Sequence, residues 1–454
     1  MMLTVVAFVV ALGVLIAVHE YGHYRMAVAC GVRVLRFSVG FGKTVFSWQP
    51  KGSPTEFVIG LLPLGGYVKM LDEREAPVAP ELRHLAFNNQ PLARRAAIVA
   101  AGPLINLLLA VVLYTLVNWG GVQQARAVLA SPTAASLAQR AGLAGGELVL
   151  RAGLDGETPA VVRSFEDLRW RLAQGALQSQ DVRLVVVAAG TSAERELVLP
   201  LASLAIRDVD ASLFRQIGVV GPMTLPVLGQ LLPDGVAGRA GLKEGDRVLR
   251  FGASVVVDGQ QLRDQIRGSV RDGKGVASVW TIDRGGRSLE LAVTPAVVQE
   301  NGTAVGRIGA YVGGPPEMVT VHYGVFDGAW NGLVKTWEVS TLTVRMLVSM
   351  LTGEASLKNL NGPLTIADYA GKSASLGLTQ YLLFLALISV SLGVLNLLPL
   401  PVLDGGHLMY YLWEAVTGKA VSDAWMARLQ RGGVAVLMMM MGIALYNDLA
   451  RLLG

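Results

Sequence analysis

The chain has 454 residues, of which 52% are hydrophobic and only 16% are charged, and its mean hydropathy is +0.47. This length favours two or three structural units, and this composition is typical of an integral membrane protein with sizeable soluble parts. The net charge of +5 is small and dispersed, which argues against a nucleic-acid partner, and the single cysteine excludes an intrachain disulfide.

Four apolar runs are long enough to cross a lipid bilayer, so we expect a polytopic α-helical membrane protein with four transmembrane helices. The four predicted spans lie within residues 1–31, 96–119, 380–406 and 431–454. The first run has neither a basic start nor a small-residue cleavage site, which favours a retained span over a cleaved signal peptide.

The distribution of Lys and Arg predicts how these spans are oriented. Between the first two spans, residues 24–95 carry ten Lys and Arg against five Asp and Glu, and the positive-inside rule therefore places this segment in the cytoplasm. With four spans, the segment 71–95 and the loop 407–430 are expected on the cytoplasmic side. Both termini and the long region 120–379 are expected on the outer side.

Residues 32–70 differ from a plain loop. Two runs rich in Val, Phe and Gly alternate apolar with other residues on either side of a turn at 49–54, which predicts strand, turn and strand. The apolarity of this β-loop indicates that part of it enters the membrane beside the first helix. Exposed backbone at that depth needs protein or a water-filled cavity to satisfy it.

The outer region contains an internal repeat. Residues 140–151 recur as 239–250, and both copies have Arg-Ala-Gly-Leu, a glycine turn and an acidic residue before a Val-Leu strand. A period this long indicates two copies of a whole domain, predicted at 120–221 and 222–312. The pattern resembles a tandem of α+β PDZ domains, although Glu147 replaces the usual aspartate in the first copy. The resemblance implies either binding of a newly exposed C-terminus or a size filter over the site.

A helix that is apolar on one face is expected at 330–351, within the outer region 313–379. It carries Lys335, Glu338 and Arg345, which favours a position on the membrane or on a domain surface over a fifth span. It would lead the chain from the repeat back to the third span.

The first span ends in His19-Glu20-Tyr21-Gly22-His23, a match to His-Glu-x-x-His. Histidines four residues apart project from one face of a helix and can bind a zinc ion together, with the glutamate beside them as general base. A chance match is improbable in a chain with only five histidines. The remaining alternative is a pair of histidines that line a polar seam between helices.

A catalytic zinc site needs a third protein ligand and one open position. Asp404 is the predicted ligand, because it follows the third apolar run within a segment, 396–407, that contains two prolines and two glycines. An ionisable group at the end of a span is functional by default. Cys30 is a weaker alternative, since a lone cysteine is more often a small apolar packing residue.

Two further features concern the substrate. Asn396 is a candidate hydrogen-bond donor to the tetrahedral oxyanion, with a helix-packing amide as the alternative. A substrate helix hides its amides in its own hydrogen bonds, and an exposed strand edge could replace those bonds by β-addition. The segment 64–68 is the candidate edge, with Gly65, Gly66 and Tyr67 as candidate substrate-binding residues; an ordinary turn leading into a strand is the alternative.

These motifs together resemble the site-2 protease family of intramembrane zinc metalloproteases. The resemblance rests on the membrane-embedded motif 19–23, the Leu-Asp-Gly core within 396–406, and the tandem PDZ-like copies between them. It extends to Ala-Ala-Gly-Pro-Leu-Ile-Asn at 100–106 in the second span and so covers essentially the whole chain. It also implies that the β-loop at 32–70 is membrane re-entrant.

The resemblance implies an enzyme with zinc as its cofactor, bound by His19, His23 and Asp404, with Glu20 as the catalytic residue and a polar role near the substrate for Asn396. The enzyme would lie in the inner membrane of a bacterium. It would cut single-pass membrane proteins after a first periplasmic cut, with an anti-sigma factor of the sigma-E stress response and remnant signal peptides as substrates.

Two functions from other classes remain as alternatives. The first is a catalytically silent, membrane-anchored PDZ scaffold with a structural metal site, which the intact Glu20 argues against. The second is a transporter that uses carboxylates and histidines at the membrane midplane. A transporter of this kind predicts inverted repeats among the spans, and the sequence contains none.

Overall fold

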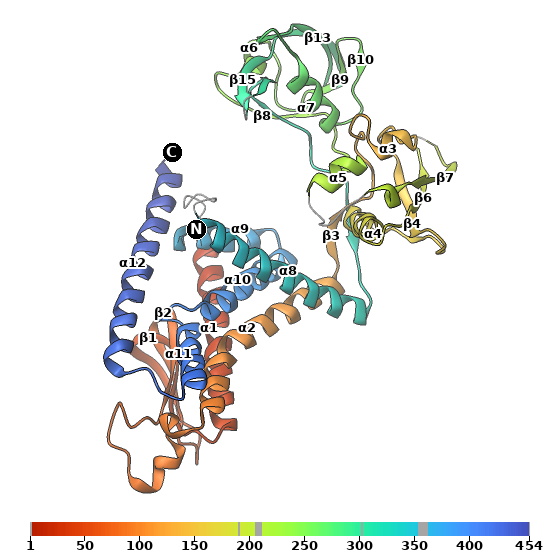
Figure 1. Ribbon diagram of the computed structural model, residues 1–454. Helices are drawn as coiled ribbons and strands as arrows, with labels where there is room; N and C mark the ends of the chain where they lie inside the picture. The colour runs from red at the N-terminus through yellow and green to blue at the C-terminus, as the bar shows by residue number, and fades with distance from the viewer. Residues whose placement is uncertain (1, 189–190, 205–210, 301–302, 353–361, 454) are drawn as a thin grey trace. The chain divides into compact units, whose positions relative to one another are not determined.

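The structure, a computed structural model, describes residues 2–188, 191–204, 211–300, 303–352 and 362–453. The chain forms two compact units, residues 1–121 with 322–454, and residues 122–321 (Figure 1). The first unit contains the His-Glu-x-x-His motif and the long apolar helices, and the second contains the internal repeat.

Among the residues that the structure describes, four helices of the first unit are long and apolar enough to cross a membrane. They are α1 (Met2–Ala29), α2 (Leu92–Gly120), α10 (Leu378–Leu397) and α12 (Asp423–Leu453). The expectation of a polytopic helical membrane protein is therefore confirmed, although α2 and α12 begin earlier than predicted and α10 ends earlier.

The first helix shows why these elements need an apolar environment on both faces. Ala7, Ala11 and Leu15 recur every four residues and are buried against the other helices. On a different face, Val6 and Val10 are 53% and 48% exposed. A helix that is apolar all round is stable only when lipid covers the part that protein does not.

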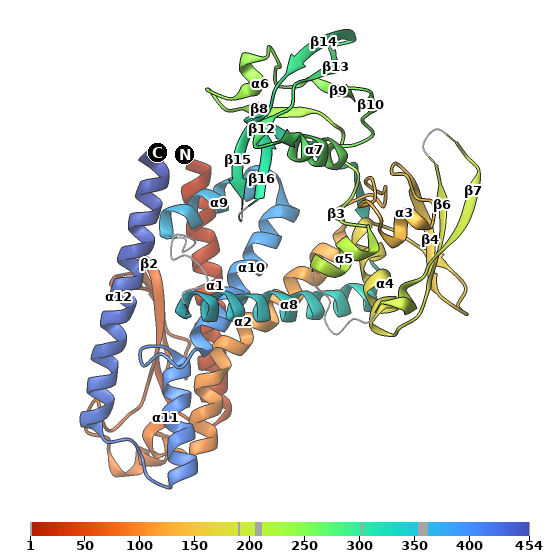
Figure 2. The ribbon, with the colours of Figure 1, turned by 45° about the horizontal axis from the view of Figure 1, so that its top comes forward.

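The amphipathic helix expected at 330–351 is present as α8 (Val325–Leu351), and it packs along α2. Its outer face carries Phe326, Trp330 and Trp337, which are 88%, 65% and 71% exposed. A shorter helix, α9 (Pro363–Ser375), packs against α1 (Figure 2). Exposed tryptophans on a helix of a membrane protein are typical of the membrane interface.

The end of the third span differs from the prediction. The run was expected to continue as one span to residue 406, but α10 ends at Leu397, because Leu398 precedes a proline and adopts an extended conformation with ψ of 145°. A separate helix, α11 (Asp404–Thr417), then begins. Asp404 is thus the first residue of a new helix, and much of the predicted loop 407–430 is helical.

The predicted β-loop forms a sheet from β1 (Val34–Trp48) and β2 (Glu56–Met70), beside α1 (Figure 2). Residues 36–39 of β1 pair with 66–69 and also with 56–59 of β2. The segment 66–69 has a strand partner on one side only among the described strands, so it forms an edge of this sheet. Two short 3-10 helices follow, η1 (Pro80–Leu85) and η2 (Phe87–Asn89).

The second unit holds two four-stranded sheets, with strand orders β5-β4-β6-β7 and β10-β9-β13-β14. The first copy comprises β3 (Val122–Ala125), α3 (Leu137–Arg140), β4 (Leu148–Leu154), β5 (Ala160–Val161), α4 (Phe165–Leu177), β6 (Val182–Val187), β7 (Glu194–Leu199), η3 (Leu201–Ser203) and α5 (Ala211–Ile217). The second comprises β8 (Leu228–Leu231), α6 (Val236–Arg239), β9 (Arg247–Phe251), β10 (Ser254–Val255), α7 (Gly259–Gly268), β11 (Val270–Arg271), β12 (Lys274–Gly275), β13 (Ser278–Arg284), β14 (Arg287–Val293), β15 (Ala296–Glu300), β16 (Thr303–Arg307) and β17 (Ala310–Val312). The strand β18 (Met318–Val321) pairs with β3.

The acidic residue of the repeat has the same role in both copies. Glu147 accepts hydrogen bonds from the backbone N–H groups of Ala144 and Gly145, both at 2.8 Å. Asp246 accepts one from the N–H of Lys243 at 2.8 Å and pairs with Arg284 at 2.7 Å. Burial alone would raise the pKa of Asp246, but these hydrogen bonds outweigh it and lower the pKa below its ordinary value. The exchange of Asp for Glu in the first copy therefore leaves the turn intact.

Candidate active site

Two histidines of α1 and the first residue of α11, which is distant in the sequence, converge on one point. His19 Nε2 lies 3.2 Å from His23 Nε2 and 3.2 Å from Asp404 Oδ2, and His23 Nε2 lies 3.5 Å from the same carboxylate oxygen. Both histidines are only 9% exposed. Two imidazoles and a carboxylate thus present one atom each to a common point.

These separations fit a metal ion such as zinc. Zinc binds histidine nitrogen at about 2.0–2.1 Å and carboxylate oxygen at about 2.0–2.2 Å in a tetrahedron, so its ligand atoms lie about 3.3 Å apart. The three observed separations of 3.2, 3.2 and 3.5 Å match this value. With these three side chains as ligands, the fourth position would stay open, as catalytic zinc sites require.

The second helix holds the ring of His23 in place. His23 Nδ1 lies 2.9 Å from the carbonyl oxygen of Ile98, to which it donates, so its Nε2 carries the free lone pair. A Cβ atom on Gly102 would lie 2.2 Å from His23 Nε2, and one on Gly22 would lie 2.5 Å from the carbonyl oxygen of Ala101. The close crossing of α1 and α2 therefore depends on glycine in both helices.

The same face of α2 carries a residue whose role the sequence analysis missed. Asn106 is completely buried, and its side-chain nitrogen lies 3.2 Å from His19 Nδ1. The signal was available, because Asn106 lies four residues after Gly102 and eight after Ile98 and so shares their helix face. In the sequence, Asn106 stands out only as the last residue of the family-like segment 100–106.

Asp404 is positioned by the turn that precedes it and by the far end of its helix. Cβ atoms on Gly405 and Gly406 would lie 2.2 Å from the Leu398 oxygen and 2.3 Å from the Leu400 oxygen, so both glycines are needed for this tight turn. Further along α11, Glu414 forms an ion pair of 2.7 Å with Arg95 of α2. The Arg95 guanidinium also stacks 5.1 Å from the centre of the Tyr411 ring. These contacts fix α11 against α2.

The candidate base, Glu20, lies against the edge of the β-sheet. A Cβ atom on Gly66 would lie 2.7 Å from Glu20 Cγ and 2.7 Å from the Ser38 oxygen. One on Gly65 would overlap the Phe41 ring, which stacks on Tyr67 with 6.2 Å between ring centres. The candidate substrate-binding edge and the candidate catalytic residue are therefore neighbours.

Two other candidates lie outside the converging group. Asn396 is partly buried near the end of α10, and its side chain has no hydrogen-bond partner among the described residues. Its role at the oxyanion stays a prediction. Cys30 lies beside the apolar cluster around Ala27 and Val32 and does not belong to the group of His19, His23 and Asp404.

A substitution of Gly66 by alanine is expected to reduce activity without removing the metal. The new methyl group would collide with Glu20 Cγ and with backbone at Ser38, and a displacement of about 1 Å at a catalytic group can cost about 100-fold in rate. The measurement is cleavage rate together with zinc content. Gly13→Ala in α1 is the control, because its Cβ would meet no atom within 4 Å; equal rates for both variants would contradict the expectation.

Comparison with known proteins identifies the family. The model of peptidase family M50 matches residues 7–440. The chain is 42% identical over 455 residues to the regulator of sigma-E protease RseP of Escherichia coli, with 98% of each chain covered. It is 41% identical over 465 residues, 99% of each chain, to a protein of Ralstonia nicotianae named as a zinc metalloprotease. It is 35% identical over 449 residues, 98% of each chain, to the regulator of sigma E protease of Haemophilus influenzae. The chain belongs to peptidase family M50, the site-2 protease family.

Proposed function

We propose that His19, His23 and Asp404 bind the zinc ion of an intramembrane endopeptidase and that Glu20 is its general base. The family shows a zinc metalloendopeptidase of the site-2 type that performs regulated intramembrane proteolysis. The observation that carries the residue assignment is the convergence of three candidate ligand atoms within 3.2–3.5 Å, with Glu20 next to His19 on the same helix.

The chemistry follows from this arrangement. Zinc held by His19, His23 and Asp404 would supply a Lewis acid that lowers the pKa of a water molecule to about 7 and polarises the carbonyl of the scissile peptide. Glu20 accepts the proton from the attacking water and returns it to the leaving amine. Asn396 donates a hydrogen bond to the developing oxyanion once a substrate is bound.

The sheet edge next to Glu20 supplies the binding mode for the substrate. Residues 66–69 have an unpaired side among the described strands, and Gly66 brings that edge against the Glu20 side chain. An extended peptide that pairs with this edge exchanges its helical hydrogen bonds for β-bonds and places its backbone beside the general base. Gly65 and Tyr67 would flank it.

The names of the relatives indicate the pathway. Proteins from Escherichia coli and Haemophilus influenzae are named regulators of sigma-E protease. We assign the present chain to the same pathway, with membrane proteins as substrates. A single-pass anti-sigma factor, already cut on its periplasmic side, is the first candidate, and remnant signal peptides are the second.

We further assign each segment of the chain to one side of the membrane. The chain is a multi-pass inner-membrane protein, with segments 71–95 and 407–430 in the cytoplasm and region 120–379 in the periplasm. The exposed apolar side chains of the β1–β2 sheet, including Phe46 at 59% and Leu61 at 61%, support a sheet that re-enters the membrane.

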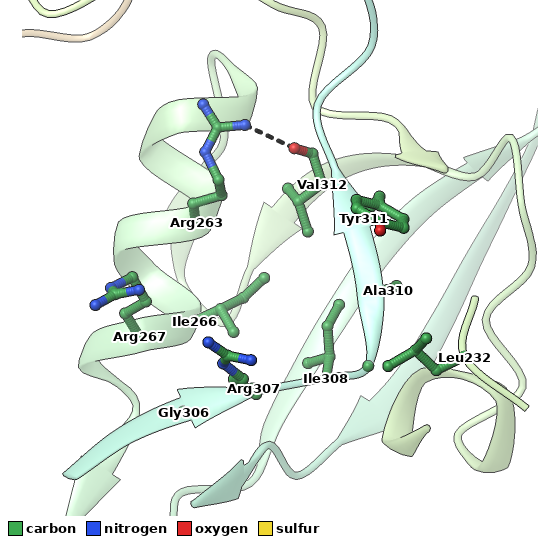
Figure 3. Close-up of a pocket in the computed structure, with 11 residues that line it drawn as sticks. Leu232, Arg263, Ile266, Arg267, Gly306, Arg307, Ile308, Ala310, Tyr311 and Val312 are labelled. Carbon is green, nitrogen blue, oxygen red and sulfur yellow. Dashed lines mark hydrogen bonds between the residues drawn. The ribbon is translucent and has the colours of Figure 1, made fainter. Parts of the chain in front are cut away.

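The repeats are assigned as PDZ-like domains. In the second copy, a groove of about 530 Å³ lies between α7 and the segment 306–312 (Figure 3). Its rim carries Arg263, which donates a hydrogen bond of 2.6 Å to the Val312 oxygen, and Arg267 and Arg307, which both pair with Glu300. Such a positively charged groove suits the carboxylate of a newly exposed C-terminus. A size filter is the alternative use of the tandem.

Reconstitution of the purified chain with a single-pass substrate tests this function. We expect cleavage within the substrate's membrane segment, loss of cleavage after a chelator removes the metal, and recovery when zinc is added back. Recovery is the informative step, because detergent damage by the chelator treatment would not be reversed by zinc. Cleavage that persists in fully metal-free protein would contradict the assignment.

A further inference from the structure

We propose that Asn106 is a positioning residue that accepts a hydrogen bond from His19 Nδ1 through its side-chain oxygen and thereby directs His19 Nε2 to the metal. This inference rests on the proposed ligand set. It adds a second helix, α2, to the machinery that prepares both histidines for zinc.

The observation behind this inference is a buried side-chain amide whose oxygen accepts no hydrogen bond. Asn106 has no exposed surface, its side-chain nitrogen lies 3.2 Å from His19 Nδ1, and its side-chain oxygen is buried without a hydrogen-bond partner. A buried polar atom without a partner costs about 1–3 kcal/mol, so such atoms are rare in folded proteins. In the orientation shown, the amide oxygen therefore lacks the hydrogen bond that a buried acceptor normally accepts.

The tautomer of His19 decides that orientation. Its Nε2 faces His23 and Asp404 and must carry a lone pair to bind a metal, so the ring proton of the neutral imidazole resides on Nδ1. An amide nitrogen facing Nδ1–H would set two donors against each other. Because the two ends of a carboxamide have nearly the same shape, a rotation by 180° places the oxygen there at no steric cost. The rotation pairs the amide oxygen with the Nδ1–H group of His19 and turns the amide nitrogen to the position that the oxygen occupies in the structure.

Packing between helices keeps Asn106 at this place. Ser389 of α10 is fully buried and donates a hydrogen bond of 2.7 Å to the backbone oxygen of Asn106. On the same face of α2, the Ile98 oxygen already lies 2.9 Å from Nδ1 of His23. One face of α2 thus supplies an acceptor to each histidine, a backbone oxygen for His23 and a side-chain oxygen for His19. Such supporting acceptors are typical of metal-binding histidines.

The experiment compares two replacements of similar shape in the purified full-length chain. Asn106→Asp keeps an acceptor oxygen at the same position, whereas Asn106→Leu removes it. The dissociation constant for zinc is measured by competition with a chromogenic chelator. We expect Asn106→Leu to bind zinc about 10–100-fold more weakly than wild type, the usual effect of losing such an acceptor, and Asn106→Asp to bind at least as tightly as wild type.

The relative zinc affinities of the two variants distinguish a positioning role of Asn106 from a packing role. A residue that only fills space would tolerate leucine better than a buried carboxylate, so aspartate would be the weaker binder. Zinc binding by Asn106→Leu equal to that of wild type, or an Asp variant weaker than the Leu variant, overturns the inference. Tyr381→Phe serves as the control for helix packing, because it removes only the hydrogen bond of 2.6 Å from α10 to the Ala7 oxygen of α1; its zinc affinity is expected to equal that of wild type.

A second measurement needs no variant of Asn106. In the cobalt-substituted wild-type protein, both histidines bound through Nε2 should give solvent-exchangeable, paramagnetically shifted Nδ1–H signals in the proton NMR spectrum. Two such signals are expected, and a single signal overturns the inference for His19. If His19→Ala binds zinc as tightly as wild type, then His19 is not a ligand and the proposed ligand set itself is wrong. Failure of the proposed function can therefore be distinguished from failure of the inference about Asn106.

Discussion

Glu20→Gln is expected to lower the cleavage rate by about 100-fold or more while zinc content stays near one ion per chain. Glutamine has the same shape but cannot accept the proton of the attacking water, and general acid–base groups contribute about 10²–10⁴-fold in rate. Glu20 does not belong to the converging group of His19, His23 and Asp404, so the substitution should leave the metal site intact. The measurements are cleavage of a reconstituted single-pass substrate and metal content of the same preparation.

The same variant separates the enzyme from a silent scaffold. A membrane-anchored scaffold with a structural metal site would not depend on Glu20 for its effect on substrates. Cleavage by Glu20→Gln at the wild-type rate would therefore remove Glu20 from the mechanism. Glu56→Gln in the nearby sheet is a suitable control, because Glu56 pairs with Arg36 at 2.8 Å and has no contact with the ligand group.

Asp404→Ala is expected to abolish both zinc binding and cleavage. The variant removes the oxygen that lies 3.2 and 3.5 Å from the two histidine nitrogens, and two histidines alone do not complete a catalytic zinc site. Metal content of the purified protein is the direct measurement. It should fall from about one zinc per chain to near zero.

The neighbouring His407 offers a matched control for this experiment. It lies one turn further along α11 and contacts Tyr410, with 5.9 Å between ring centres, and it does not belong to the converging group. His407→Ala should therefore retain its zinc. One zinc retained by Asp404→Ala would exclude that carboxylate as a ligand, and zinc lost from His407→Ala would place the imidazole in the site.

Much of the architecture could be predicted because it depends on local patterns. The apolar runs predicted the four helices of membrane-spanning length and apolarity among the described residues, and the alternation in residues 32–70 predicted two strands. The boundaries were less accurate where local and tertiary effects compete. Pro399 ends α10 before the apolar run does, and α11 occupies a segment that was expected to be a loop, because its helix packs against α2.

The residues of the candidate site could likewise be predicted from the sequence only in part. The chain by itself determined that His19, Glu20 and His23 share a helix, because four-residue spacing places side chains on one face whatever surrounds the helix. Only the tertiary structure decided that Asp404 reaches both imidazoles and that the Asn106 side chain lies beside His19. It also decided that Gly66 lies against Glu20. Such contacts depend on how separate elements pack. The four-residue spacing of Ile98, Gly102 and Asn106 places them on one face of α2, but it does not determine which helix that face meets.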